Sequence, residues 1–342
     1  ISVLVIACPC SIGLAIPMAL VSASGAAALK GLIIKNGESI QTSKDINYIF
    51  LDKTGTITSG KPEVIEYSIN NDLFSIISAL EQHSIHPLAK SIYIFAQKKI
   101  LNKKISFDTV SETAGEGISG NLNNKTYFAG KPSSSAPYSE LLKKGYTVIE
   151  IKVDNQIKGF IALSDIIKPD SYEAIKKFKK IGIIPVMVTG DNEITAKFVA
   201  ESVGITEIKS KVKPDEKVKF IREYQINKFK VAMVGDGIND AAALKTADIG
   251  IAVGTGADIA IDSADIIIRN GELTKVVDAI TISRLTFKKI KQNLFWSLFY
   301  NAAAIPLAAA GIIHPIIAET AMCLSSINVI LNSIQKKYNY KK

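Results

Sequence analysis

Three short motifs place acidic and hydroxyl side chains directly behind apolar runs. The first run, Tyr48-Ile49-Phe50-Leu51, is followed by Asp52-Lys53-Thr54-Gly55-Thr56. The second run, Val186-Met187-Val188, is followed by Thr189-Gly190-Asp191. The third run, Val231-Ala232-Met233-Val234, is followed by Gly235-Asp236-Gly237-Ile238-Asn239-Asp240. Short apolar runs that end in polar loops are typical of buried strands. Helical patterns over 170–181, 193–203 and 215–225 intervene. Strands that alternate with helices predict a parallel sheet with right-handed crossovers.

Ligands of such sheets bind beyond the carboxyl ends of the strands, which is where Asp52, Thr189, Asp236 and Asp240 fall. Carboxylates gathered at one edge require a cation, and hard oxygen ligands favour Mg²⁺. With Mg²⁺ and a lysine to offset phosphate charge, one carboxylate can attack a phosphoryl group and form an aspartyl phosphate. Lys217, at the start of a predicted helix, is the candidate lysine.

The apolar residues are concentrated at the two ends of the chain. Of the 342 residues, 47% are hydrophobic and 21% are charged, which excludes a disordered chain. Residues 1–29 carry no charge, and 293–333 carry only Glu319. A membrane-spanning helix needs about 20 residues. We therefore expect one span in 1–29 and two in 293–334, with a turn at Gly311, His314 and Pro315.

The net charge is +9, and a good part of the basic excess lies beside these apolar segments. The flanking basic residues are Lys30, Lys35, Arg284, Lys288, Lys289, Lys291, Lys336, Lys337, Lys341 and Lys342. Basic flanks hold membrane helix ends on the cytoplasmic side. The charge therefore predicts a multi-pass membrane protein with cytoplasmic catalytic domains and contacts to lipid, and no binding of nucleic acid. Because the apolar run is already under way at Ile1, we expect further spans before it.

Cys8 and Cys10 flank Pro9 within the first apolar segment. We expect both thiols to stay reduced in a protein that faces the cytosol, since a disulfide between them would close a very short loop. Proline removes a backbone donor and opens a membrane helix, and broken membrane helices line pathways. Thiolates select soft ions such as Cu(I). The segment therefore predicts a soft-metal site.

These motifs together resemble the heavy-metal-transporting P-type ATPases, and in particular the copper(I)-exporting class. Residues 52–56 resemble the DKTGT phosphorylation signature, the TGD and GDGxND segments match two further catalytic motifs, and Cys8-Pro9-Cys10 matches the membrane motif. The resemblance covers essentially the whole chain. It implies an α/β fold: a haloacid dehalogenase-like parallel-sheet phosphorylation domain with an inserted α+β nucleotide-binding domain, flanked by transmembrane helices. It also implies ATP-driven transport of Cu(I) or Ag(I).

The resemblance implies roles for single residues in phosphoryl transfer. Asp52 is the nucleophile, and Asp52, the Thr54 main chain and Asp236 hold Mg²⁺. The other implied catalytic residues are Lys53, Thr189, Gly190, Asp191, Lys217, Asn239 and Asp240.

For ATP, the resemblance implies binding by Glu81, His86, Gly115 and Gly117 in the inserted domain. This chain departs from the family pattern at Ile85, where Glu is usual, and at Lys131, where Asn is common. We therefore expect an atypical nucleotide affinity.

For copper, the resemblance implies ligands on three membrane helices. They are Cys8, Cys10, Tyr300, Asn301, Met322 and Ser326. A small copper chaperone is the implied metal donor. The zinc–cadmium class remains an alternative, although it normally has an Asp in the final helix and this chain has none there.

The resemblance divides the chain into segments. They are a membrane helix over 1–29, the phosphorylation domain over 30–63 and 158–283, the nucleotide-binding domain over 64–157, a membrane hairpin over 284–335 and a basic tail over 336–342. The family's TGE actuator loop does not occur in this sequence, so we expect a fragment that holds the phosphorylation half of the cycle. A membrane-tethered haloacid dehalogenase-like phosphatase is a further alternative, but it would need neither Cys8-Pro9-Cys10 nor 64–157. A degenerate pump would have a broken catalytic set, and this set is intact.

Overall fold

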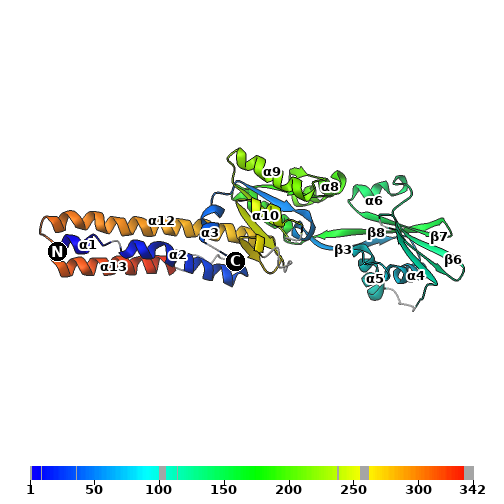
Figure 1. Cartoon of the computed structure of the whole chain (residues 1–342), viewed down its shortest axis with the longest axis horizontal. Coiled ribbons are helices and arrows are strands. Elements are labelled where there is room, and N and C mark those ends of the chain that lie inside the picture. Colours follow the sequence, from blue (N-terminus) through cyan, green and yellow to red (C-terminus); the bar gives the residue numbers. More distant parts are fainter. Residues whose placement is uncertain are drawn as a thin grey trace. The chain divides into compact units, whose positions relative to one another are not determined.

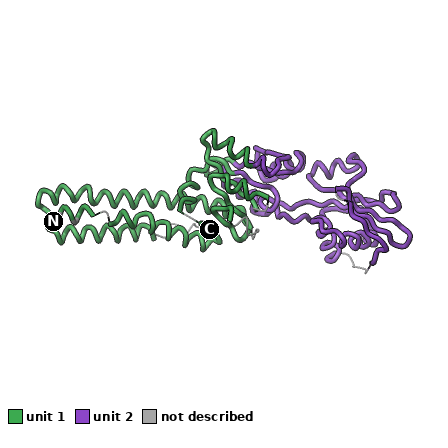
Figure 2. The backbone as a smooth tube through the Cα atoms, viewed as in Figure 1, with its two compact units in different colours: residues 1–49, 180–184, 218–342 green, residues 50–179, 185–217 purple. Residues whose placement is uncertain are grey.

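The computed structural model describes residues 2–8, 10–35, 37–99, 105–113, 115–236, 239–254 and 262–334. The chain forms two compact units (Figure 2). The first comprises residues 1–49, 180–184 and 218–342, and the second comprises 50–179 and 185–217.

Four helices of the first unit lie side by side (Figure 1). They are α1 (Ser2–Ile6), α2 (Cys10–Leu29), α12 (Thr274–Ala309) and α13 (Pro315–Ile334). Among the described residues, α2 and α13 are long and apolar enough to cross a membrane. The predicted break near Cys8 is confirmed, because α1 ends at Ile6 and α2 begins at Cys10; Pro9 itself lies outside the described residues. The predicted turn is also confirmed, since Gly311 has a φ of 77° between α12 and α13.

A buried amide joins three of these helices. The Asn293 side chain on α12 is fully buried, and its Nδ2 donates to the Ala15 carbonyl of α2 at 3.0 Å and to Ser333 Oγ of α13 at 2.8 Å. Its Oδ1 accepts a hydrogen bond from Asn332 Nδ2 at 2.8 Å. Small residues at every fourth position of α2, from Ser11 to Ala27, form its buried face and allow this close approach.

The first unit also holds four strands, in the order β1 (Leu32–Ile34), β13 (Ile266–Ile268), β12 (Ile249–Val253) and β11 (Val231–Gly235). β1 runs antiparallel to β13, and the other two pairs are parallel. Every residue of β11, β12 and β13 is buried, as in parallel sheets that are covered on both faces. The short helices α3 (Gly37–Ser43) and α10 (Ala241–Thr246) pack beside β12, and α3 also contacts α12.

In the second unit, β9 (Ile184–Val188) pairs in parallel with β10 (Glu207–Lys209). These strands and β2 (Tyr48–Asp52), which the boundary between the units divides, belong to the same seven-stranded sheet as the four above. The helices are α7 (Ser171–Lys180), α8 (Glu193–Val203) and α9 (Pro214–Ile226), the last beginning in this unit. The predicted strands before the three motifs and the predicted helices are confirmed to within a few residues.

A second sheet, antiparallel and six-stranded, is inserted between β2 and α7. Its order is β3 (Thr58–Tyr67), β8 (Gln156–Ile167), β7 (Thr147–Val153), β6 (Lys125–Gly130), β5 (Gly117–Leu122) and β4 (Thr109–Thr113). Helices α4 (Asn71–Glu81) and α5 (Pro87–Lys99) pack on it, and Phe74, Leu80 and Ile92 lie in their shared core. A short turn η2 (Ala136–Tyr138) leads into helix α6 (Ser139–Lys143). The predicted fold class is confirmed. The strands extend beyond 64–157 on both sides, so the domain boundaries stay a prediction.

Asn293→Ala should lower the stability of the helical part of the molecule. The change removes the three hydrogen bonds and leaves the half-buried Asn332 amide without its acceptor, at a cost of about 1–3 kcal/mol. A lower Tm of the protein in detergent would show this. Thr320→Ala is the control, because its hydroxyl bonds a carbonyl of its own helix, that of Ile316. An unchanged Tm in Asn293→Ala would contradict the prediction.

Candidate active site

Strand β2 ends on Asp52, a nearly buried carboxylate. Lys217 reaches it from the first turn of α9, with Nζ 2.5 Å from Asp52 Oδ1. The two residues are 8% and 6% exposed. A buried carboxylate keeps its charge when a cation pairs with it at this distance. The pair therefore presents an ionised carboxylate beside a fixed positive charge.

The residues after Asp52 form a tight turn, η1 (Lys53–Ile57). Gly55 has a φ of 75° and Gly60 a φ of 70°, both in the left-handed region. A Cβ at Gly60 would lie 3.1 Å from the backbone of Gly55, so the chain passes closely over the turn. Thr54 is exposed, whereas Thr56 is buried and its Oγ1 has no hydrogen-bond partner in the described part of the chain.

The strand that returns from the inserted sheet holds this turn in place. Lys168 Nζ donates to the Gly55 carbonyl at 2.6 Å, and Lys168 N donates to the Ile57 carbonyl at 3.0 Å. The Asp165 carboxylate accepts hydrogen bonds from Ser59 Oγ at 3.1 Å and from Gly60 N at 2.9 Å. Sequence reasoning missed Asp165 and Lys168. The only available signal was a charged pair at the end of the strand that leads back to the first sheet.

The Thr189-Gly190-Asp191 loop at the end of β9 lies beside the same turn. Lys53 Nζ is 2.6 Å from Asp191 Oδ2. The two groups form an ion pair whose angles do not meet those of a hydrogen bond. Thr189 is 3% exposed, and its Oγ1 accepts a hydrogen bond from Asp191 N at 3.2 Å. Gly190 is exposed. The second unit thus brings Asp52, Lys53, Asp191 and Lys217 into two adjacent ion pairs.

The third motif lies at the carboxyl end of β11, in the first unit. Asp240 is 1% exposed and comes directly before α10. A Cβ at Gly235 would lie 2.5 Å from Asp240 Oδ2, so glycine lets this carboxylate fold back over the strand end. Asp236 is half-buried and Asn239 is exposed, while Gly237 and Ile238 lie outside the described residues.

The oxygen donors fit Mg²⁺. Carboxylates and a main-chain carbonyl are its usual protein ligands, and it is commonly held by one or two carboxylates with water and phosphate completing the shell. The described residues contain no group of three acidic, His or Cys side chains that could hold a metal by themselves.

The predicted nucleotide residues of the inserted sheet surround the end of α4. Glu81 is 6% exposed, and burial, with a smaller contribution from the charge of Glu112, raises its pKa to about 7. Ser84 Oγ donates to Glu112 at 2.6 Å and accepts a hydrogen bond from His86 N at 3.1 Å. His86 Nδ1 accepts a hydrogen bond from Leu88 N, which places its proton on Nε2. Ile85 is fully exposed.

The Gly115–Gly117 turn packs against the end of β6. Gly117 has a φ of 149°, and a Cβ there would lie 2.3 Å from the Ala129 carbonyl. A Cβ at Gly130 would likewise lie 2.2 Å from the Glu116 carbonyl. Lys131 N donates to that carbonyl at 2.7 Å, so Lys131 lies directly beside the glycine turn.

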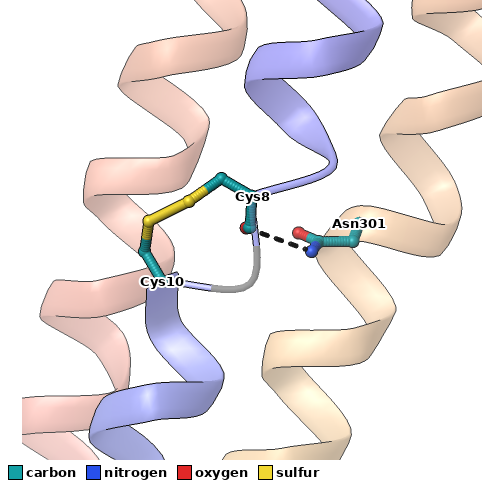
Figure 3. Close-up of a disulfide and its surroundings, with 3 residues drawn as sticks. All are labelled: Cys8, Cys10 and Asn301. Atoms are coloured by element: carbon teal, nitrogen blue, oxygen red, sulfur yellow. Dashed lines mark hydrogen bonds between the residues drawn. A yellow bond between two sulfur atoms is a disulfide. The ribbon is translucent and has the colours of Figure 1, made fainter.

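Cys8 and Cys10 are joined by a disulfide, with their Cα atoms 5.5 Å apart (Figure 3). This corrects the expectation that both thiols stay reduced. The interruption of the helix lets the two side chains point the same way, so the two sulfur atoms meet. Because the thiolate is the metal-binding form, the pair must be reduced before it can hold a metal.

Asn301 of α12 faces this segment, with Nδ2 3.5 Å from the Cys8 carbonyl (Figure 3). Tyr300, Met322 and Ser326 are half-buried, and Met322 and Ser326 share a face of α13 because they are four residues apart. Their neighbour Ser325 is 2% exposed, and its Oγ has no hydrogen-bond partner within the described ranges.

Comparison with known proteins agrees with this geometry. The family model for haloacid dehalogenase-like hydrolases matches residues 46–248. A copper-exporting P-type ATPase of Staphylococcus epidermidis is 43% identical over 98% of this chain and 44% of its own length. The chain spans about half the length of the curated relatives it matches.

Two solved structures are also similar. A zinc-transporting PIB-type ATPase in its E2.Pi state has a TM-score of 0.87 and 31% identity, over 96% of this chain and 56% of that one. The catalytic domain of the CPx-ATPase CopB-B has a TM-score of 0.64 and 30% identity, over 74% of this chain and 96% of that one. The chain therefore belongs to the haloacid dehalogenase-like hydrolases, in the branch formed by the heavy-metal P-type ATPases.

Glu81 should make the folded protein less stable as the pH rises. Its pKa is about 7 in the folded chain against an ordinary 4.5, so the folded state holds an extra proton between these values. The free energy of unfolding therefore falls from pH 4.5 to 7 and is level above. The loss is about 3 kcal/mol.

Glu81→Gln, which stays neutral, should lack this decline when thermal unfolding is followed from pH 4.5 to 8. Glu140→Gln is the control, because Glu140 is exposed and forms an ion pair with the nearby Lys143. Parallel curves for Glu81→Gln and the wild type would refute the assignment.

Proposed function

We propose that the protein carrying this chain couples ATP hydrolysis to the movement of Cu(I) or Ag(I) across a membrane, through phosphorylation of Asp52. The observation that carries this proposal is the buried Asp52–Lys217 pair at the end of β2. It provides an ionised nucleophile with one oxygen held by a cation, which is what attack on a charged phosphoryl group requires.

In the proposed reaction, an Asp52 oxygen attacks the γ-phosphorus of ATP. A new bond forms between this oxygen and phosphorus, the bond to the bridging oxygen breaks, and ADP leaves with that electron pair. Lys217 offsets charge on the phosphoryl oxygens, and Thr189 offers its hydroxyl to them. The Lys53–Asp191 pair holds the two loops together during transfer. Mg²⁺, when bound by Asp52, the Thr54 main chain and Asp236, would neutralise phosphate charge.

The inserted sheet is the proposed nucleotide-binding domain, for which 64–157 remains the proposed range. Glu81, His86 and the Gly115–Gly117 turn lie around one corner of it, at the end of α4 and between β4 and β5. The space where a Cβ would lie at Gly115 is open, which lets a flat base approach the backbone closely there, and His86 offers an Nε2 proton. Positioning of the nucleotide dominates the rate of phosphoryl transfer.

The proposed transport site consists of Cys8, Cys10, Tyr300, Asn301, Met322 and Ser326. Two thiolates and a thioether suit a soft monovalent ion. Glu319 is the only acidic residue of α13, near its start. Transport of zinc or cadmium is the second candidate, favoured by the likeness to a zinc-transporting structure, but the sulfur ligands and the lack of an Asp in α13 favour copper.

The proposed location is a membrane, crossed several times, with the catalytic domains on the cytoplasmic side. Support comes from the apolar helices α2 and α13 and from the basic residues beside them. In this setting a small cytosolic chaperone would deliver the ion once the Cys8–Cys10 disulfide has been reduced.

Asp52→Asn should abolish phosphoenzyme formation. The full-length protein with ATP and Mg²⁺ should form an acid-stable phosphoenzyme that hydroxylamine cleaves, because an acyl phosphate is open to this nucleophile. Radiolabel retained after acid precipitation measures it. Asp45→Asn is the control, since Asp45 is more exposed and forms an ion pair with Lys44. Labelling that persists in Asp52→Asn would show that another residue is the nucleophile.

ATP hydrolysis by the full-length protein should be stimulated by Cu(I) or Ag(I) under reducing conditions. Cys8→Ser and Cys10→Ser should lose the stimulation, and Met322→Ala should weaken the metal affinity about tenfold by removing one soft ligand. Cys323→Ser, next to Met322 but exposed, should behave as the wild type. Equal stimulation by Zn²⁺, or a copper response that survives in the double cysteine variant, would overturn the assignment to copper.

A further inference from the structure

One continuous helix, α12, connects the membrane segment to the soluble part of the first unit. It runs for 36 residues from Thr274 to Ala309 without a break. Arg284 and Asn301 both lie on it, 17 positions apart, which corresponds to about 26 Å at 1.5 Å per residue. A displacement at one of these positions is therefore carried to the other.

Arg284 forms hydrogen bonds to the segments just before two catalytic strands, β2 and β9, which we call the bases of these strands. Its Nε donates to the Lys44 carbonyl at 3.2 Å, and its Nη1 donates to the Ile181 carbonyl at 2.8 Å. Lys44 comes just before β2, and Ile181 just before β9. Sequence reasoning counted Arg284 among the basic residues at the membrane boundary, but its guanidinium is half-buried and bonded within the soluble part.

The strand bases that Arg284 holds are themselves cross-linked. The Asn47 carbonyl accepts a hydrogen bond from Ile184 N at 2.9 Å, which links the start of β2 to the start of β9. Asn47 N donates to the Lys230 carbonyl at 2.9 Å, and Lys230 N donates to Asn47 Oδ1 at 2.8 Å. A movement of Arg284 is therefore shared by the strands that end in Asp52 and Thr189.

The far end of α12 is tied to the proposed metal site. Asn301 donates to the Cys8 carbonyl, and two turns nearer the cytoplasm Asn293 bonds both α2 and α13. These contacts fix α12 against the segment that carries Cys8 and Cys10. Any shift of this segment on metal binding must act on α12.

We propose that Arg284 is a positioning residue through which metal binding between the membrane helices sets the position of Asp52 for phosphoryl transfer. This inference rests on the proposed function. Arg284 touches neither substrate nor metal; it transmits the position of α12 to the bases of β2 and β9. The planar guanidinium reaches two carbonyls at once, which a lysine ammonium on a flexible stem does not reproduce.

The experiment uses the full-length protein with Arg284→Gln and Arg284→Lys. Two reactions are compared: phosphorylation by ATP as a function of Cu(I), and phosphorylation of the metal-free protein by inorganic phosphate. Arg284→Gln should lower the stimulation by Cu(I) about tenfold, within the usual range of coupling between sites. It should leave phosphorylation by inorganic phosphate within about twofold of the wild type, and Arg284→Lys should restore part of the stimulation. Lys288→Gln, an exposed position one turn further along α12, is the control.

Each other outcome overturns the inference. If both reactions fall together in Arg284→Gln, the residue is a structural anchor. If neither changes, α12 acts on the strands through other contacts. If the wild type itself forms no phosphoenzyme in response to Cu(I), the proposed function fails first, and this result is distinct because it is seen before any variant is made.

Discussion

The ion pair between Asp52 and Lys217 is the constraint on which the rest of the structure depends. A carboxylate that is 8% exposed is stabilised in its charged form by the lysine beside it, and this lysine comes from a helix 165 residues further along the chain. The sheet and its crossover helices must therefore be complete before the nucleophile exists in this form. The Lys53–Asp191 ion pair beside it also stabilises the site, because it joins the loops that follow β2 and β9.

The long insertion between β2 and α7 leaves this arrangement intact because the residues at its end bond to the residues at its beginning. Lys168 and Asp165, at the end of the returning strand, bond the residues just after Asp52. The turn at Gly55 and the residues after it are thereby held by main-chain and side-chain contacts from the end of β8. A domain can be added at this point without loosening the nucleophile.

The helical part of the first unit uses polar contacts where apolar packing offers little specificity. Small side chains along α2 permit close approach, and the Asn293 amide fixes the register of three helices. The interruption between α1 and α2 exposes the Cys8 carbonyl to Asn301 and lets the sulfur atoms of Cys8 and Cys10 meet. The same interruption of the helix explains why Cys8 and Cys10 form a disulfide when oxidised and offer two thiolates when reduced.

Local sequence determined the strands that lead to Asp52, Thr189 and Asp236, because apolar runs and polar turns are readable over a few residues. Tertiary structure alone decided the contacts of Lys168 and Arg284. Their partners are main-chain carbonyls, which every residue carries, so no residue type in the sequence marks them. Burial likewise decided the raised pKa of Glu81, and the interruption between α1 and α2 decided the bond between Cys8 and Cys10. Desolvation and the meeting of side chains depend on the folded surroundings, and residue order by itself does not contain them.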